Sequence, residues 1–130
     1  MSNLVDLDTV APFDVWGDAV RARRIEGERI TFAVVELAPH ALVPEHRHPQ
    51  EQLGMVITGT VRFRIDDEIR DLAPGGTWRI LSGHPHEVTA GPEGAVVIDT
   101  FAPIRSDWNF ELHEPRPTVW PVAAEKGARE

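Results

Sequence analysis

The stretch His46-Arg47-His48-Pro49-Gln50-Glu51-Gln52 carries the most information in this sequence. In an extended chain, residues two positions apart point to the same side, so the imidazoles of His46 and His48 can face one point. Gln52 has the same parity, and His86 precedes a β-rich run further along the chain. Three imidazole nitrogens and an amide oxygen suit Zn, Ni, Mn, Fe or Co. The residues therefore predict a metal site; the alternative is two surface histidines beside a proline turn.

The surrounding sequence predicts short strands. Val61, Phe63 and Ile65 alternate with polar residues, and the polar turn Asp66-Asp67-Glu68 leads into a returning strand, 69–72. Further β-rich runs are 30–37, 52–57, 78–81 and 95–101, and most of the 10 Gly and 11 Pro that could punctuate such runs lie between them. This spacing indicates an all-β sandwich or barrel. No long amphipathic helix is evident, and Asp14 to Ala22 could form at most a short helical segment.

Two motifs resemble those of the cupins. The first is the opening stretch continued for six residues to Gly59, and the second is Pro74-Gly75-Gly76, Ser82-Gly83 and Pro85-His86. The resemblance covers about residues 30 to 105. It implies an all-β, single-domain double-stranded β-helix, the cupin jelly-roll barrel, with one divalent transition metal per chain in its mouth. The implied ligands are His46, His48, Gln52 and His86.

The sequence departs from the cupin pattern at three positions. Gln52 stands where a Glu ligand is usual, and Glu51 is one place out of register with it. His40 replaces the glycine of the first motif, and Gly76 replaces a frequent acidic residue. A neutral Gln leaves the charge of the metal uncompensated, which favours Lewis-acid chemistry and anionic substrates. It also means that any base must come from another residue.

A second set of polar residues lies in the run 97–105. Asp99 and Phe101 share one face of the predicted strand, and Arg105 follows shortly after Pro103. A carboxylate inside an apolar strand is costly unless it is paired or functional. It could serve as a general acid/base, and an arginine binds carboxylates through paired hydrogen bonds. The alternative is that Asp99 and Arg105 pair with each other and close the end of the barrel.

Gln52 together with the Asp99, Phe101, Arg105 pattern resembles a cupin subgroup of pectin and alginate breakdown. Those enzymes convert cyclic 4,5-unsaturated uronates to the linear keto form. The resemblance implies an isomerase- or lyase-type enzyme with a small carboxylated substrate. In that reading Arg105 holds the carboxylate, Asp99 transfers a proton and Phe101 packs against the substrate. Aromatic polyketide cyclases, oxygenases and non-catalytic metal- or ligand-binding cupins remain alternatives.

Composition narrows the remaining possibilities. The chain has 130 residues, 42% of them hydrophobic, which fits one domain. A net charge of −8 argues against nucleic acid and anionic membrane as partners, and the absence of Cys excludes disulfides and thiol chemistry. With no signal-peptide or transmembrane pattern, a cytoplasmic protein is expected. We expect residues 1–114 to form the barrel with its N-terminal strands. Residues 115–130 would form a Pro-containing tail, extended to Pro121 and mobile beyond about Ala123.

Several other residues have simpler expected roles. Leu53, Met55 and Ile57 should face outward if Gln52 faces the interior, so the N-terminal strands or a second subunit must cover them, and a homodimer is expected. Trp78 alternates with Ile80 and is expected in the core, whereas Trp108 could line the mouth. Arg21, Arg23, Arg24 and Arg29 are expected on a solvated face with ion pairs.

Overall fold

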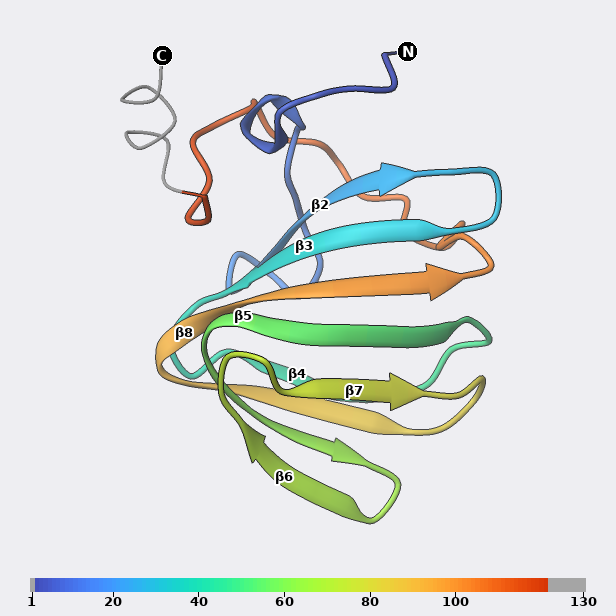
Figure 1. Ribbon diagram of the computed structural model, residues 1–130, viewed down its shortest axis with the longest axis vertical. Helices are drawn as coiled ribbons and strands as arrows, with labels where there is room; N and C mark the ends of the chain where they lie inside the picture. The colour runs from blue at the N-terminus through green and yellow to red at the C-terminus, as the bar shows by residue number, and fades with distance from the viewer. Residues whose placement is uncertain (1, 122–130) are drawn as a thin grey trace.

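The computed structural model describes residues 2–121 of the chain (Figure 1). Apart from one 3-10 turn, its regular structure is all β. The elements are η1 (Leu7–Thr9), β1 (Phe13–Asp14), β2 (Val20–Glu26), β3 (Thr31–Leu37), β4 (Leu42–His46), β5 (Glu51–Ile65), β6 (Glu68–Leu72), β7 (Thr77–Ile80) and β8 (His86–Ala102). Within the described residues, no helix has the length and apolar character that crossing a membrane requires.

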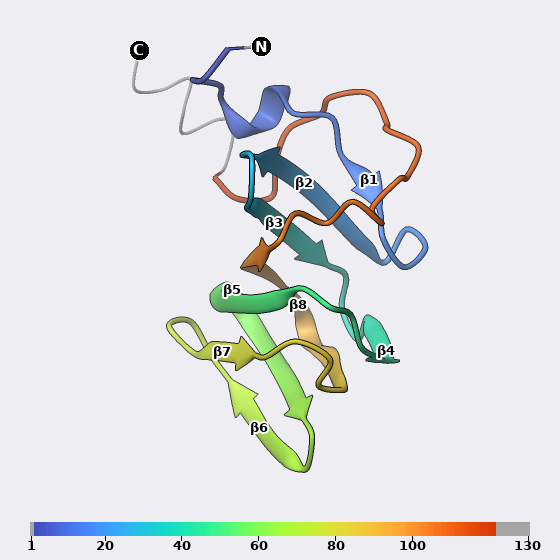
Figure 2. The same cartoon turned by 90° about the vertical axis from the view of Figure 1, so that its right-hand side faces the viewer.

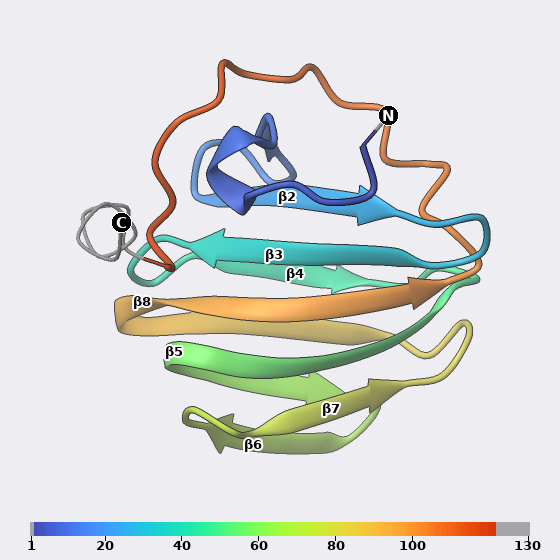
Figure 3. The same ribbon diagram turned by 45° about the horizontal axis from the view of Figure 1, so that its top comes forward.

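Two long strands run through both layers of the fold (Figure 3). The second half of β8 pairs with β3 and with the first half of β5, which also pairs with β7. The first half of β8 pairs with β4 and with the second half of β5, which also pairs with β6. All these pairings are antiparallel, and the register of β5 on β8 shifts around Gly59. This is the predicted jelly roll, a double-stranded β-helix.

The alternating sequence pattern sets which side chains form the core. In β5, Val61 and Phe63 are buried, whereas Arg62 is exposed and hydrogen-bonds to Asp71 on β6. The two predicted runs 52–57 and 61–65 belong to one strand, because the chain passes Gly59 at a positive φ of 76° and continues in the second layer. The predicted hairpin after Ile65 is present as β5–β6.

The N-terminal region differs from expectation. The helical segment expected within 14–22 is wrong: the chain there leaves β1 and enters β2, which pairs with β3. Arg23 is only 2% exposed rather than solvated; it pairs with Glu36 at 2.8 Å and donates to the carbonyls of Val10 and Arg116. The segment after β8 lies beside β1 and β2 (Figure 2), so it supplies one of these partners. Residues 122–130, the end of the expected tail, lie outside the described residues.

His40 occupies the position where the first cupin motif has glycine, and the structure shows why glycine is usual there. Its φ is +62°, in the left-handed region that costs about 1–2 kcal/mol for most residues with a Cβ. We expect His40→Gly to stabilise the fold by about 0.5–1 kcal/mol, because the strain that glycine relieves at this positive φ exceeds the additional backbone entropy that glycine loses on folding. Thermal unfolding should show a midpoint raised by a few degrees.

The neighbouring substitution Ala38→Gly is the matched control for this prediction. Ala38 is exposed and its φ is not positive, so the glycine there brings entropy loss without relief of strain. Its unfolding midpoint should fall. Equal shifts for the two variants would show that the backbone at His40 is unstrained.

Candidate metal centre

Three histidines from two parts of the chain meet at one end of the fold. His46 ends β4, His86 begins β8, and the two residues are register partners in that sheet layer. His48 lies in the turn between β4 and β5. The ligand atoms offered by these three side chains all lie within 4.8 Å of one another. The sequence spacing had therefore selected histidines that the topology brings together.

The Nδ1 atom of each histidine faces a backbone carbonyl oxygen. His46 Nδ1 lies 2.8 Å from the carbonyl oxygen of Pro44, His48 Nδ1 2.9 Å from that of Gln50, and His86 Nδ1 3.0 Å from that of His84. Since a carbonyl only accepts, each Nδ1 carries the proton and each Nε2 keeps a lone pair. His86 Nε2 is buried without a hydrogen-bond partner in the described structure. This donor set fits a divalent metal ion.

Burial favours the neutral form of the His48 and His86 imidazoles. It lowers the pKa of His86 to about 4, and the neighbouring His46, His48 and Arg105 act in the same direction. Burial is also the main reason that the pKa of His48 is lowered, with Arg105 as the next cause. Only the neutral ring can ligate a metal, so His48 and His86 are in the metal-binding form at neutral pH.

Gln52 supplies the fourth group of the cluster. Its side chain is buried and its Oε1 lies 3.1 Å from His48 Nε2, while Glu51 is exposed, as strand parity predicted. Gln52 Nε2 donates to Asp99 Oδ1 at 2.8 Å. Two acceptor atoms, the amide oxygen and the imidazole lone pair, therefore face each other. A cation between them would remove that repulsion.

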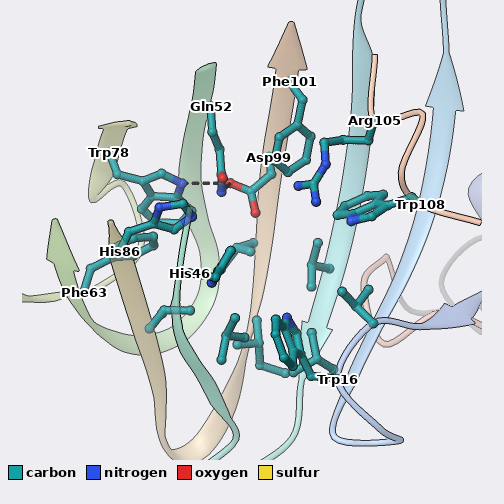
Figure 4. Close-up of a pocket in the computed structure, with 17 residues that line it drawn as sticks. Trp16, His46, Gln52, Phe63, Trp78, His86, Asp99, Phe101, Arg105 and Trp108 are labelled. Carbon is teal, nitrogen blue, oxygen red and sulfur yellow. Dashed lines mark hydrogen bonds between the residues drawn. The ribbon is translucent and has the colours of Figure 1, made fainter. Parts of the chain in front are cut away.

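Asp99 lies on β8 beside Gln52 and is 8% exposed. Its Oδ1 accepts hydrogen bonds from Gln52 and from Trp78 Nε1, each at 2.8 Å. Burial raises the pKa of Asp99 to about 6, although these hydrogen bonds and the charge of Arg105 lower it. Asp99 does not form the direct ion pair with Arg105 that was one alternative. Both residues line the same cavity (Figure 4).

Arg105 is stacked between two aromatic rings. Its guanidinium carbon lies 4.7 Å from the ring centre of Phe101 and 4.5 Å from that of Trp108. Its Nε and Nη2 donate to the two carboxylate oxygens of Asp107, at 3.0 and 2.9 Å. No partner of Nη1 occurs among residues 2–121, so the outer edge of the guanidinium remains able to bind a carboxylate.

The rest of the cavity wall is apolar. Figure 4 shows the polar groups of Gln52, Asp99 and Arg105 at one end of the cavity and Trp16 at the other. Trp16 is 40% exposed and its ring centre lies 5.7 Å from that of His46. The aliphatic lining residues are Val15, Val20, Val35, Leu37, Val43, Val88 and Val97. The site therefore combines a polar end with a long apolar wall.

All seven residues singled out by the sequence lie in or beside this site. Phe101 is 3% exposed and its ring contacts those of His48 and Trp108, so Phe101 also packs against other residues of the site.

Sequence reasoning missed three contributors to the site: Trp78, which had been assigned to the core alone, Gln50 and Asp107. Gln50 donates to Asp107 at 3.3 Å and to the carbonyl of Ile104 at 3.2 Å. The position of Gln50, two residues after His48, was the only sequence signal that could have indicated its role in the site.

Comparison with known proteins identifies the family. Residues 33–101, more than half of the 130, match the model of the cupin domain family. The chain is a cupin. This cupin is 29% identical over 104 residues to the pectin degradation protein KdgF of Dickeya dadantii (strain 3937), covering 78% of this chain and 94% of that protein. The similarity confirms the predicted resemblance to the pectin-degrading subgroup.

Solved structures agree with this assignment at the level of the fold. An RmlC-like cupin from Shewanella frigidimarina NCIMB 400 matches with a TM-score of 0.76 at 20% identity, covering 83% of this cupin and 96% of that chain. KdgF from Halomonas sp. matches with a TM-score of 0.68 at 23% identity, covering 73% of this cupin and 88% of that chain. Oxalate decarboxylase from Bacillus subtilis matches with 0.71 at 24% identity, covering 88% of this cupin and 32% of that chain.

Proposed function

We propose that this cupin is a metal-dependent enzyme of isomerase or lyase type acting on a small carboxylated sugar such as a 4,5-unsaturated uronate. The observation that carries this proposal is the cluster of three Nε2 lone pairs beside Asp99 and Arg105 at one end of a cavity. The similarity to the pectin degradation protein KdgF supports the choice of substrate.

The residues divide the chemistry of uronate ring opening among them. A divalent ion held by His46, His48, His86 and Gln52 would supply Lewis-acid polarisation of a substrate oxygen. The free edge of Arg105 binds the substrate carboxylate. Asp99 takes a proton from the anomeric hydroxyl as the bond between the anomeric carbon and the ring oxygen breaks. It then gives that proton to C4 of the double bond, so that the enolate released at C5 becomes a ketone and the protons balance.

The direct test is to supply a 4,5-unsaturated uronate to metal-loaded protein. The expected result is a loss of the ultraviolet absorbance of the conjugated double bond, faster than in buffer. Chelator-treated protein should lose this activity and regain it when the metal is restored. A rate equal to that in buffer, with metal bound, would reject the uronate as substrate.

An aromatic polyketide cyclase is the second candidate, and the apolar wall of the cavity favours it. The aliphatic residues there offer no partners for sugar hydroxyls, whereas they suit a planar carbon skeleton. Such a substrate would use the same polar end for its enolisable carbonyl. Parallel assays with an unsaturated uronate and a poly-β-keto substrate separate the two functions, because only one should turn over with metal-dependent rates.

We also propose a homodimer that uses the outer face of β5. Leu53 is 50% exposed and Met55 38%, so the N-terminal strands do not cover them. The strand register continues this patch to Phe32 and Ile25, each 37% exposed. Light scattering at micromolar concentration should give twice the mass of one chain, and Leu53→Glu should shift it to a monomer. A monomeric parent protein would contradict the proposal.

A further inference from the structure

The side-chain amide of Gln52 can point either its oxygen or its nitrogen towards the histidines, and only the oxygen can bind a metal. The orientation is set by Asp99, because Gln52 Nε2 donates to Asp99 Oδ1 at 2.8 Å. A carboxylate oxygen accepts and does not donate. With its nitrogen committed to Asp99, the amide presents Oε1 to His48 Nε2, 3.1 Å away.

Trp78 holds the same carboxylate oxygen from the other side. Its indole Nε1 donates to Asp99 Oδ1 at 2.8 Å, and its ring stacks on Phe63 with 4.7 Å between ring centres. Gly54 is the register partner of both Asp99 and Trp78. A Cβ at Gly54 would collide with the indole nitrogen and lie 2.5 Å from Asp99 Oδ1. The absent side chain leaves the space in which this hydrogen bond forms.

We propose that Trp78 is a positioning residue for the metal: through Asp99 Oδ1 it fixes the Gln52 amide with its oxygen towards the three histidines. The proposal rests on the metal site of the proposed function and is independent of the substrate. The two carboxylate oxygens of Asp99 then have different roles: Oδ1 orients Gln52, and Oδ2 remains free for proton transfer. It also accounts for the amide at position 52, because a glutamate there has no N–H to donate to Asp99 and its carboxylate would repel that of Asp99 unless the two shared a proton.

Zinc affinity, measured by competition with a chromophoric chelator, tests the proposal without any turnover. Changes around metal ligands typically lower affinity by about 10–100-fold. We expect Asp99→Leu to fall in that range, and Asp99→Asn to stay within about threefold of the parent because its carbonyl oxygen still accepts both hydrogen bonds. Trp78→Phe, which removes only the donor and one ring, should lower affinity about three- to tenfold.

A double-mutant cycle separates positioning from simple structural damage. If Trp78 acts through Gln52, then Trp78→Phe should have no effect on zinc affinity in a Gln52→Ala background. Ile80→Val, a packing change on the same strand without a hydrogen bond, should lower thermal stability and leave zinc affinity within twofold of the parent. An equal loss from Trp78→Phe in both backgrounds, or no loss in either, overturns the proposal. Circular dichroism confirms that each variant is folded.

Discussion

Asp99→Asn is expected to lower turnover by about 10²–10⁴-fold, the range that general acid/base groups contribute. Metal content should stay near one ion per chain. The substitution removes the group that accepts and returns a proton, but keeps an oxygen where Gln52 and Trp78 donate. The measurement is kcat on the substrate that the parent converts, together with elemental analysis of the same sample.

The control for this prediction is Asp71→Asn. Asp71 is an exposed carboxylate that pairs with Arg62 on the surface, and neither residue lines the cavity. It should leave kcat unchanged. A turnover in Asp99→Asn equal to the parent's would remove Asp99 from the proton transfer and leave it only its part in orienting Gln52.

Arg105→Met is expected to raise KM about 100-fold or more, with a smaller effect on kcat. It removes the paired hydrogen bonds to the substrate carboxylate, a loss of about 3 kcal/mol. Methionine retains much of the volume between Phe101 and Trp108, so the aromatic stack keeps its spacing. Arg105→Lys keeps the charge but loses the planar fork, and its KM should lie between those of the parent and Arg105→Met.

Arg62→Met serves as the matched control for Arg105. Arg62 also binds an aspartate through Nε and Nη2, but this pair is exposed on β5 and β6. Its kinetic constants should equal the parent's. If Arg105→Met raised KM no more than Arg62→Met does, the substrate carboxylate would have to bind elsewhere.

Sequence patterns predicted the parts of the site that depend on strand parity. The positions of His46, His48 and Gln52 follow from side chains alternating across an extended chain, and Gln52 rather than Glu51 is indeed the buried one. His86, which the sequence separates from the others, was a candidate because it precedes a β-rich run, and the resemblance to cupins supported that choice. The register of β4 on β8 then places His46 opposite His86.

The contacts that sequence could not predict depend on pairing between distant strands. Trp78 was assigned to the core from its alternation with Ile80, and it is buried; its hydrogen bond to Asp99 requires the register of β7 and β8 on either side of β5. The burial of Arg23 was missed for a similar reason, because its partners Val10 and Arg116 come from the two ends of the chain. Local patterns contain no information about such partners.

The central claim is that His46, His48, His86 and Gln52 hold one metal ion, and elemental analysis tests it most directly. Tag-free protein, purified without chelator and supplied with a divalent metal, should contain about one ion per chain. The His46→Ala/His48→Ala variant, treated identically and shown to be folded, should contain none. A parent protein that stays empty after metal is supplied, or a double variant that binds as much metal as the parent, would contradict the claim.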